Sequence, residues 1–243
     1  MTKIFAHRGA SAYAPENTME AFELAAKQGA DGIELDVHVT KYGEVVVTHD
    51  EKIDRVSNGS GFIKDMTLRE LKRLSFHNHM ESYVGAGIPT LREVLEYVST
   101  TNMDVNIELK TGIYWYPQIE EKTAFIVQET GMHDRVIYSS FNHATIRKIH
   151  ELDPKAQTGF LYADGTMDMP GYAKRYGVNA LHPALYNLQY PGFMEQCRRN
   201  GLKVHVWTVN ETEHLEFCCR YGVDAVITNY PDRAMEIVGR KTE

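Results

Sequence analysis

Glu34 and Asp36 lie one residue apart within an apolar run, and their types and spacing point more directly to chemistry than any other residues. Side chains alternate between the two faces of a β-strand, so a strand here places both carboxylates on one face. Glu108 and Lys110 repeat the pattern further along the chain. Buried charges need partners, and ligands that are all oxygen favour a hard cation. We therefore predict a site for one divalent metal ion, Mg²⁺ or Ca²⁺, at Glu34, Asp36 and Glu108.

Two basic residues and two histidines accompany these carboxylates in the sequence. Arg8 and Lys110 cannot bind a cation and would be repelled by it unless an anion lay between them, and a phosphate is the natural bridging anion. His7 and His49 can exchange protons near neutral pH, one activating a nucleophile and the other protonating a leaving oxygen. Together, these residue types predict metal-assisted phosphoryl transfer from a phosphodiester.

Each of these residues has a simpler interpretation when it is taken alone. A Glu-x-Asp pair is more often a solvent-facing stripe on a strand. His7 would be a strand-end histidine, His49 with Asp50 a turn, and Lys110 a solvated strand end. Trp207 would more often belong to the core. The functional interpretation therefore depends on the joint occurrence of these residues.

The hydrophobic pattern predicts the elements that position them. A strand near residues 3–7 precedes a helix that starts at Asn17-Thr18, and a second strand spans residues 32–40. The next apolar run follows too soon for a helical crossover, so it should pair back as a hairpin. A two-residue turn at Tyr42-Gly43 would then set His49 opposite Asp36.

Later apolar segments alternate with helical stretches, some of which begin with capping boxes at Thr67 and Thr90. Repeated β-α order in 243 residues without a linker predicts one domain, residues 1–243, of the α/β class with a TIM-type (β/α)8 barrel. Nine candidate strands exceed eight places, so residues 44–48 are assigned to an antiparallel appendage. The later strands are expected at 104–109, 135–139, 158–162, 179–182, 203–208 and 224–228.

Composition restricts the possible partners and the cellular location. The net charge is −7, from 26 Lys and Arg against 33 Asp and Glu, which argues against nucleic-acid binding and against docking on anionic membranes. The first residues lack the apolar stretch of a signal peptide, and no run approaches the length of a membrane span. We therefore expect a cytoplasmic protein without stable membrane anchoring. The three cysteines form neither a zinc spacing nor a disulfide framework, and the sequence leaves the oligomeric state open.

Short motifs are distributed over nearly the whole chain. They are His7-Arg8-Gly9, Pro15-Glu16-Asn17-Thr18, Glu34-Leu35-Asp36-Val37, Val46-Val47-Thr48-His49-Asp50, Pro89-Thr90-Leu91, Glu108-Leu109-Lys110, Trp207-Thr208-Val209-Asn210 and Thr228-Asn229-Tyr230-Pro231. In sequence and in order, these motifs resemble the glycerophosphodiester phosphodiesterase family. The resemblance implies a TIM-type barrel that hydrolyses glycerophosphodiesters, which are deacylated phospholipids such as glycerophosphocholine and glycerophosphoethanolamine. The products would be sn-glycerol 3-phosphate and an alcohol.

The resemblance also implies a role for individual residues. Phe141 and Trp207 resemble an apolar wall against the glycerol carbons, and Glu16 resembles a support for the loop near Arg8. Asn17 resembles part of the helix cap. The remaining roles carry over as metal ligands at Glu34, Asp36 and Glu108, an acid and base pair at His7 and His49, and phosphate contacts at Arg8 and Lys110. Either the glycerol 2-hydroxyl or water could attack phosphorus, and either histidine could be the acid.

Residues 51–66 form a short insertion in this interpretation, and we expect it to leave an open mouth that tolerates several head groups. Other classes of protein remain as alternatives. A lysophospholipase D or a phosphoinositide phospholipase C would share the histidines and the acidic site, and an aromatic cluster at Tyr114–Tyr116 is the feature that fits such an enzyme. A metal-dependent sugar isomerase would not need Arg8 and Lys110 together, and a non-catalytic barrel would not need both histidines.

Overall fold

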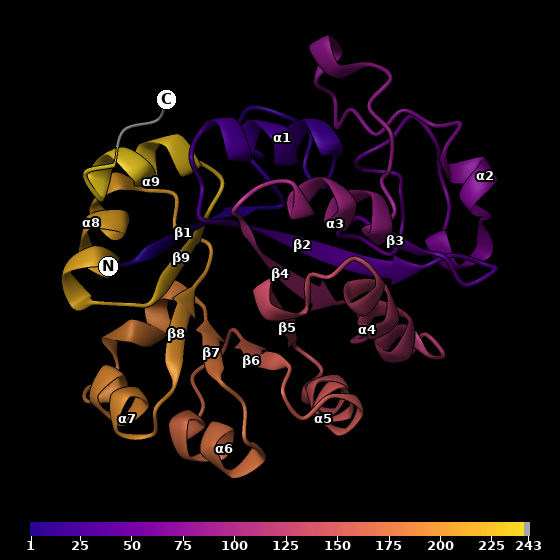
Figure 1. Ribbon diagram of the computed structural model, residues 1–243. Coiled ribbons are helices and arrows are strands. Elements are labelled where there is room, and N and C mark those ends of the chain that lie inside the picture. Colours follow the sequence, from indigo (N-terminus) through magenta and orange to yellow (C-terminus); the bar gives the residue numbers. More distant parts are fainter. Residues whose placement is uncertain (241–243) are drawn as a thin grey trace.

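Parallel strands close into a barrel in the part of the chain that this computed structural model describes, residues 1–240 (Figure 1). Neighbouring strands follow the order β1-β9-β8-β7-β6-β5-β4-β2, and β1 also pairs with β2, which closes the ring. The TIM-type barrel predicted from the β-α alternation is therefore confirmed. Its strands are β1 (Lys3–His7), β2 (Gly32–Val39), β4 (Asp104–Leu109), β5 (Val136–Ser140), β6 (Gln157–Tyr162), β7 (Ala180–Pro183), β8 (Lys203–Val206) and β9 (Ala225–Thr228).

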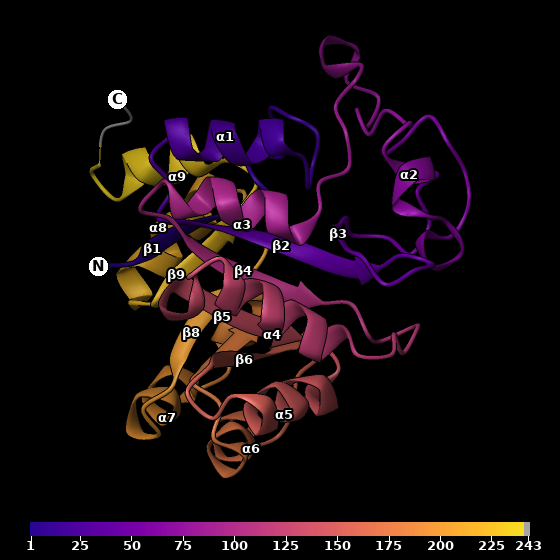
Figure 2. The same cartoon turned by 45° about the vertical axis from the view of Figure 1, so that its right-hand side comes forward.

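Helices surround the barrel, except for α2, which lies to one side of it in both views (Figure 1 and Figure 2). The helices are α1 (Met19–Lys27), α2 (Leu68–Leu71), α3 (Leu91–Ser99), α4 (Ile119–Glu129), α5 (His143–Leu152), α6 (Met169–Tyr176), α7 (Phe193–Arg199), α8 (Thr212–Tyr221) and α9 (Pro231–Ile237). The capping boxes predicted at Thr67 and Thr90 are present at the starts of α2 and α3. Among the described residues, no helix combines the length and apolar character needed to cross a bilayer.

The predicted hairpin exists, but its register differs by one residue from the expected one. β3 (Val45–Val47) pairs antiparallel with β2. The connection contains three residues, 41–43, and ends at Gly43 with a φ of +97°, which is a common hairpin geometry. Consequently Thr48, rather than His49, lies opposite Asp36, and the Thr48 amide donates a hydrogen bond of 3.0 Å to the Asp36 carbonyl oxygen.

The chain between β3 and α3 forms a small unit with its own apolar core. Residues 51–66, expected as a short insertion, make up the first part of this longer segment. Three short 3₁₀ or α-helical turns occur within it, at Ile63–Asp65, Leu68–Leu71 and Glu81–Tyr83. The buried residues of its core are Val46, Ile53, Val56, Ile63, Leu71, Phe76 and Ile88.

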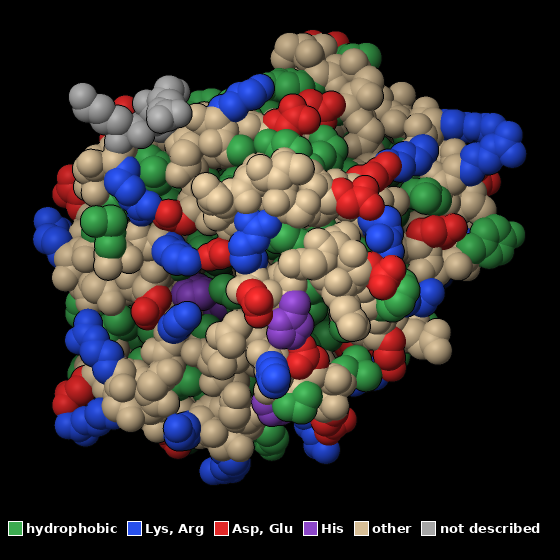
Figure 3. Space-filling model, in the orientation of Figure 1, with side chains coloured by type: hydrophobic (Ala, Val, Ile, Leu, Met, Phe, Trp, Pro, Cys, Tyr) green, Lys and Arg blue, Asp and Glu red, His purple; other side chains and the backbone are tan. Residues whose placement is uncertain are grey.

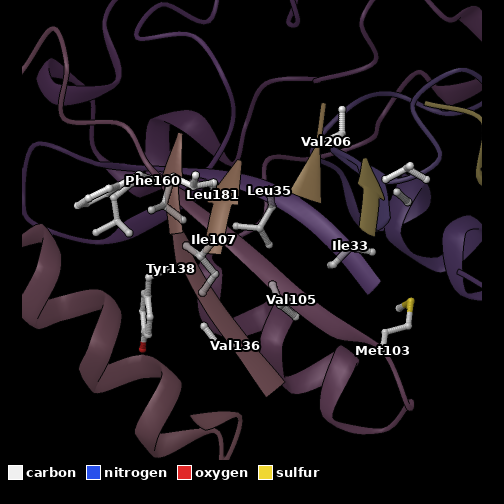
Figure 4. Packing of buried hydrophobic residues seen from close by; sticks show 14 of the residues in the cluster. Ile33, Leu35, Met103, Val105, Ile107, Val136, Tyr138, Phe160, Leu181 and Val206 are labelled. Carbon is white, nitrogen blue, oxygen red and sulfur yellow. The ribbon is translucent and has the colours of Figure 1, made fainter. Parts of the chain in front are cut away.

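Alternation along the strands separates the apolar packing from the chemistry. On β2 and β4, one face carries Ile33, Leu35, Val105 and Ile107, which belong to the large core between the sheet and the helices (Figure 4). The other face carries the polar residues of these strands and points into the barrel. The surface carries mixed charges, and Figure 3 shows Lys and Arg side chains interspersed with Asp and Glu.

Two histidines fill the barrel interior away from the carboxylates. His182 is fully buried, and an ideal Cβ at Gly159 would lie only 2.4 Å from its Nε2, so this glycine makes room for the imidazole. The ring centroid of His205 lies 4.7 Å from that of His182. Burial lowers the pKa of His182 to about 3, so the folded protein keeps this ring neutral.

Stability should therefore fall in mild acid because of His182. The unfolded chain binds a proton at this histidine below pH 6.5, whereas the folded chain does not until about pH 3. Stability is lost as the pH falls through this window, and His182 alone should lower the free energy of unfolding by about 2 kcal/mol at pH 5 relative to pH 8. Urea unfolding of the wild type and His182→Asn across this range would measure it. The variant should lack this part of the slope, whereas His214→Asn, at an exposed position, should keep it; an unchanged slope in His182→Asn would contradict the assignment.

Candidate active site

Strand register brings the predicted carboxylates together at the carboxyl end of the barrel. In the parallel ladders, Glu34 lies beside His7 of β1, and Asp36 lies beside Glu108 of β4. One oxygen from each of Glu34, Asp36 and Glu108 lies within 4.8 Å of the others, and all three residues are buried. The expectation that the Glu-x-Asp pair shares one face holds, and that face points into the barrel rather than toward solvent.

Three buried carboxylates repel one another, and their pKa values are shifted in different directions. Burial and the neighbouring Asp36 and Glu108 charges raise the pKa of Glu34 well above its usual value. Burial and Asp36 also raise the pKa of Glu108, to about 7, although Lys110 opposes this change. Burial would raise the pKa of Asp36 too, but Lys110 and Arg8 hold it below its usual range. The cluster thus carries more acidic groups than its basic neighbours neutralise.

Arg8 and Lys110 are the basic neighbours that stand on either side of Asp36. Lys110 Nζ lies 2.9 Å from Glu108 Oε1 and 3.7 Å from Asp36 Oδ1. Arg8 Nε lies 3.5 Å from Asp36 Oδ2, and the Arg8 backbone amide donates to Glu34 Oε2 at 3.1 Å. Both cationic side chains are largely buried, so they present positive charge inside the same site as the carboxylates.

The donor set fits a hard divalent cation. Within residues 1–240, the buried Asp36 Oδ1 accepts no hydrogen bond, which leaves a lone pair available to an ion. Burial and the neighbouring carboxylates raise the pKa values of Glu34 and Glu108, and the nearby basic side chains do not cancel this rise. Carboxylate oxygens are the ligands that Mg²⁺ and Ca²⁺ prefer. Glu34, Asp36 and Glu108 could therefore hold one such ion.

His7 ends β1 and faces the carboxylates with one nitrogen. Its Nδ1 lies 2.7 Å from the side-chain oxygen of Asn229, and its Nε2 lies 4.0 Å from Glu34 Oε2. An amide oxygen can only accept a hydrogen bond, so the proton of the neutral ring lies on Nδ1 and Nε2 keeps a lone pair. Burial and the Arg8 charge lower the pKa of His7 to about 4.

His49 reaches the same cavity from beyond the end of β3. Its Nδ1 lies 2.6 Å from a carboxylate oxygen of Asp50, which leaves Nε2 free. The buried His38 holds the backbone, because its Nε2 donates to the His49 carbonyl oxygen at 3.0 Å while its Nδ1 accepts from Tyr116 at 2.9 Å. The hairpin register therefore did not place His49 as expected, yet the chain beyond the hairpin brings it to the carboxylates.

Glu16 and Asn17 support the first loop, each through a different contact. Glu16 Oε1 accepts from Arg8 Nη1 at 2.9 Å. The Asn17 amide donates to Asp36 Oδ2 at 2.9 Å, so Asn17 fixes a carboxylate instead of capping α1. Thr18 alone provides the side-chain cap of that helix. The loop is tight at Gly9, where an added Cβ would lie 2.6 Å from the Ala21 backbone.

Phe141 and Trp207 form an aromatic wall of the same cavity. Their rings meet edge to face with centroids 5.5 Å apart. They line a cavity of about 80 Å³, and Phe141 is 45% exposed at its rim. The cavity brings together His7, Arg8, Glu34, His49, Glu108, Phe141 and Trp207 of the predicted set, with Asn106, Leu161, Thr208 and Ile227 as further lining residues.

Three residues that contact this set were not assigned a role from the sequence. Asp50 follows His49 directly and could have been considered as its hydrogen-bond partner. Asn229 follows the last strand, and closure of the barrel between β9 and β1 is the signal that places it beside His7. Arg55 lies in the connecting segment, where no periodicity or spacing indicates its contacts. The members of the aromatic cluster at Tyr114–Tyr116 do not share one environment, since Trp115 is exposed whereas Tyr116 is buried against His38.

The fold and this site define a barrel enzyme for phosphate esters, and comparisons with known proteins make the class specific. Residues 7–233 match the glycerophosphoryl diester phosphodiesterase family. The chain is 44% identical to a glycerophosphodiester phosphodiesterase of Caldanaerobacter subterraneus subsp. tengcongensis, over 98% of both chains, and 40% identical to one of Bacillus altitudinis, again over 98% of both. The chain belongs to this family and is a phosphodiester hydrolase.

Solved structures agree with this assignment. A glycerophosphodiester phosphodiesterase from Agrobacterium tumefaciens superposes with a TM-score of 0.86 at 30% identity, covering 97% of this chain and 100% of the other. An Oleispira antarctica phosphodiesterase, solved in complex with the product sn-glycerol-3-phosphate, superposes with a TM-score of 0.92 at 26% identity, covering 98% and 97%. These likenesses extend over the whole barrel.

The acidic cluster should make stability depend on divalent ions. We expect Mg²⁺ or Ca²⁺ to raise the free energy of unfolding, by about 2.7 kcal/mol when the ion exceeds its Kd about 100-fold. Glu108→Gln removes one anionic ligand with little change of shape and should abolish most of this increase. Urea unfolding with and without each ion would measure the effect. Glu213→Gln, at an exposed position of α8, is the control; an undiminished increase in Glu108→Gln would contradict the ligand assignment.

Proposed function

We propose that this protein hydrolyses glycerophosphodiesters, such as glycerophosphocholine and glycerophosphoethanolamine, to sn-glycerol 3-phosphate and an alcohol, with the help of one divalent cation. The observation that carries the proposal is that three buried carboxylates, two buried cationic side chains and two histidines lie together at one end of the barrel, where all of them except Asp36 and Lys110 line one cavity. A phosphodiester would use all of these groups. Its charged oxygens would lie between the metal ion and the two basic side chains, and the histidines would transfer protons at the ester bond that is cleaved. The product named in the Oleispira antarctica complex supports the same substrate class.

Some of the residues of the site would act through their charge, and others would hold groups in position. Glu34, Asp36 and Glu108 would hold the ion, which supplies charge stabilisation to the phosphoryl oxygens when it is bound. Arg8 and Lys110 bind the phosphate, and this interaction strengthens as negative charge develops on its oxygens. Phe141 and Trp207 lie against the glycerol carbons and exclude water from that side. Asn17, through Asp36, and Glu16, through Arg8, keep these groups in place.

The two histidines differ in the partners of their Nδ1 atoms, and this difference assigns their roles. The neutral amide of Asn229 leaves His7 with a free lone pair on Nε2, so His7 accepts the proton of the attacking hydroxyl. The Asp50 carboxylate holds His49 through Nδ1 and turns Nε2 toward the cavity, so we assign to His49 the other step, the donation of an Nε2 proton to the leaving alcohol oxygen. His7 serves this purpose whether the attacking hydroxyl belongs to glycerol or to water.

Removal of either histidine should abolish most of the activity. His7→Ala and His49→Ala should each lower kcat by about 10²–10⁴-fold, the usual contribution of a positioned acid or base. The measurement is the metal-dependent release of sn-glycerol 3-phosphate from glycerophosphocholine. His214→Ala, which alters an exposed histidine, should leave the rate unchanged. If both site variants retained wild-type rates while Glu108→Gln was inactive, the acid and base assignment would be wrong and the metal site would stand.

The size of the cavity favours tolerance of several alcohols. Its volume of about 80 Å³ is small compared with the roughly 300–1,000 Å³ of common ligand sites. It has room for the phosphate and only part of the adjoining glycerol, so the alcohol would extend toward solvent beyond Phe141. Turnover of glycerophosphocholine, glycerophosphoethanolamine and glycerophosphoglycerol should therefore agree within about tenfold, since a factor of ten corresponds to only 1.4 kcal/mol. A preference of about a hundredfold for one head group would contradict this expectation.

A further inference from the structure

Arg55 connects two parts of the site, the loop that carries His49 and the loop that carries Arg8. Its Nε and Nη2 donate to the two carboxylate oxygens of Asp50 at 2.8 and 3.1 Å, and its Nη1 and Nη2 donate to the two oxygens of Glu16 at 2.8 Å each. Asp50 in turn bonds His49, and Glu16 bonds Arg8. One guanidinium therefore links the orienting partner of a histidine to the orienting partner of the phosphate-binding arginine.

The segment around Arg55 is anchored on both sides. Ile53 is fully buried and Val56 is 3% exposed, and both belong to the small core of the segment between β3 and α3. The Val56 amide also donates to the Ile53 carbonyl oxygen at 3.3 Å, which closes a turn around Arg55. The small core thus fixes the backbone on either side of Arg55. The Arg55 guanidinium in turn connects this segment to the site.

We propose that Arg55 is a positioning residue for the phosphodiesterase reaction, which holds His49 through Asp50 and Arg8 through Glu16. The inference rests on the proposed function, because His49 and Arg8 matter only if they act on the substrate. It names a residue outside the cavity, since Arg55 is absent from the cavity lining and, within residues 1–240, its side-chain hydrogen bonds go to Asp50 and Glu16.

The geometry requires arginine rather than a positive charge alone. Both carboxylates are bound in a two-pronged manner, which the planar fork of a guanidinium allows and the single ammonium of lysine does not. Although the Arg55 side chain is 43% exposed, Glu16 is only 12% exposed, so their contact is partly shielded from water. In agreement, the bonds from Arg55 and His49 outweigh the effect of burial and lower the pKa of Asp50 to about 2.

Charge balance explains why both links matter together. Glu16 is shared between Arg8 and Arg55. Without Arg55, the whole charge of Glu16 would face Arg8, which would draw that guanidinium toward the loop and away from a phosphate. Asp50 would at the same time lose the partner that fixes its rotation, so the His49 ring would no longer be held in one orientation. A shift of about 1 Å in a reacting group can lower a rate about a hundredfold.

Arg55→Gln and Arg55→Lys test the proposal with two kinds of measurement. The first is independent of activity: the His49 Nδ1 proton, held by Asp50 at 2.6 Å, should give a protected downfield resonance in the proton NMR spectrum of the wild type. His49→Ala identifies this resonance by its loss. In both Arg55 variants the resonance should broaden or disappear through exchange with water. Arg73→Gln, an exposed arginine of the same segment, is the matched control and should retain it.

The second measurement is steady-state hydrolysis of glycerophosphocholine. Both Arg55 variants should lower kcat about tenfold to a hundredfold, with Arg55→Lys failing to restore it despite its charge. An intact resonance in both Arg55 variants, or a wild-type kcat in Arg55→Lys, would overturn the positioning role. If the wild type did not hydrolyse the substrate, the proposed function would fail, while the NMR comparison would still decide whether Arg55 holds His49.

Discussion

The structure depends on one electrostatic constraint, which is the confinement of Glu34, Asp36 and Glu108 in a space where one oxygen of each lies within 4.8 Å of the others. Charges of like sign at this distance and away from water are strongly unfavourable. Strand register fixes the three residues there, so the remaining parts of the site have to compensate. Arg8, Lys110 and the Asn17 amide compensate part of the negative charge of the carboxylates, and a bound cation could compensate the rest. An anionic substrate can then enter a site that would otherwise repel it.

The barrel can accommodate this cluster of charges because the two faces of each strand have different roles. The outward face stabilises the fold, and the inward face carries the polar groups of the site. The outward residues of β2 and β4 pack against the helices and supply apolar burial, as Ile33 and Ile107 illustrate (Figure 4). The inward residues are free to be polar at the carboxyl end. Deeper in the barrel, Phe5, Ala225 and Ile227 form a separate apolar cluster. Polar groups near the substrate therefore do not interrupt the core that holds the fold.

Sequence reasoning could predict whatever follows from periodicity within one element. The alternation at Glu34 and Asp36, the β-α order and the capping boxes at Thr67 and Thr90 all depend on local spacing, and the structure has them. The hairpin register failed because loop length depends on the backbone conformation at Gly43, which the residue type permits but does not determine. Asn229 depends on a contact with His7, 222 residues away, and the link from Arg55 to Glu16 joins residues that are 39 apart. No local pattern encodes such contacts.

The two histidines are consequently held by different kinds of contact. One is fixed by strand pairing and the other by side-chain hydrogen bonds. His7 ends β1, a strand that pairs with β2 and β9, and His7 itself lies in the ladder beside Glu34. His49 lies beyond β3, where the ladder has ended, and depends on side-chain bonds from His38 and Asp50. Its position is therefore only as firm as the connecting segment that carries Arg55. Because connecting segments open more easily than strands of the sheet, changes in this segment should act on His49 and, through Glu16, on Arg8, while the three carboxylates on β2 and β4 keep their places.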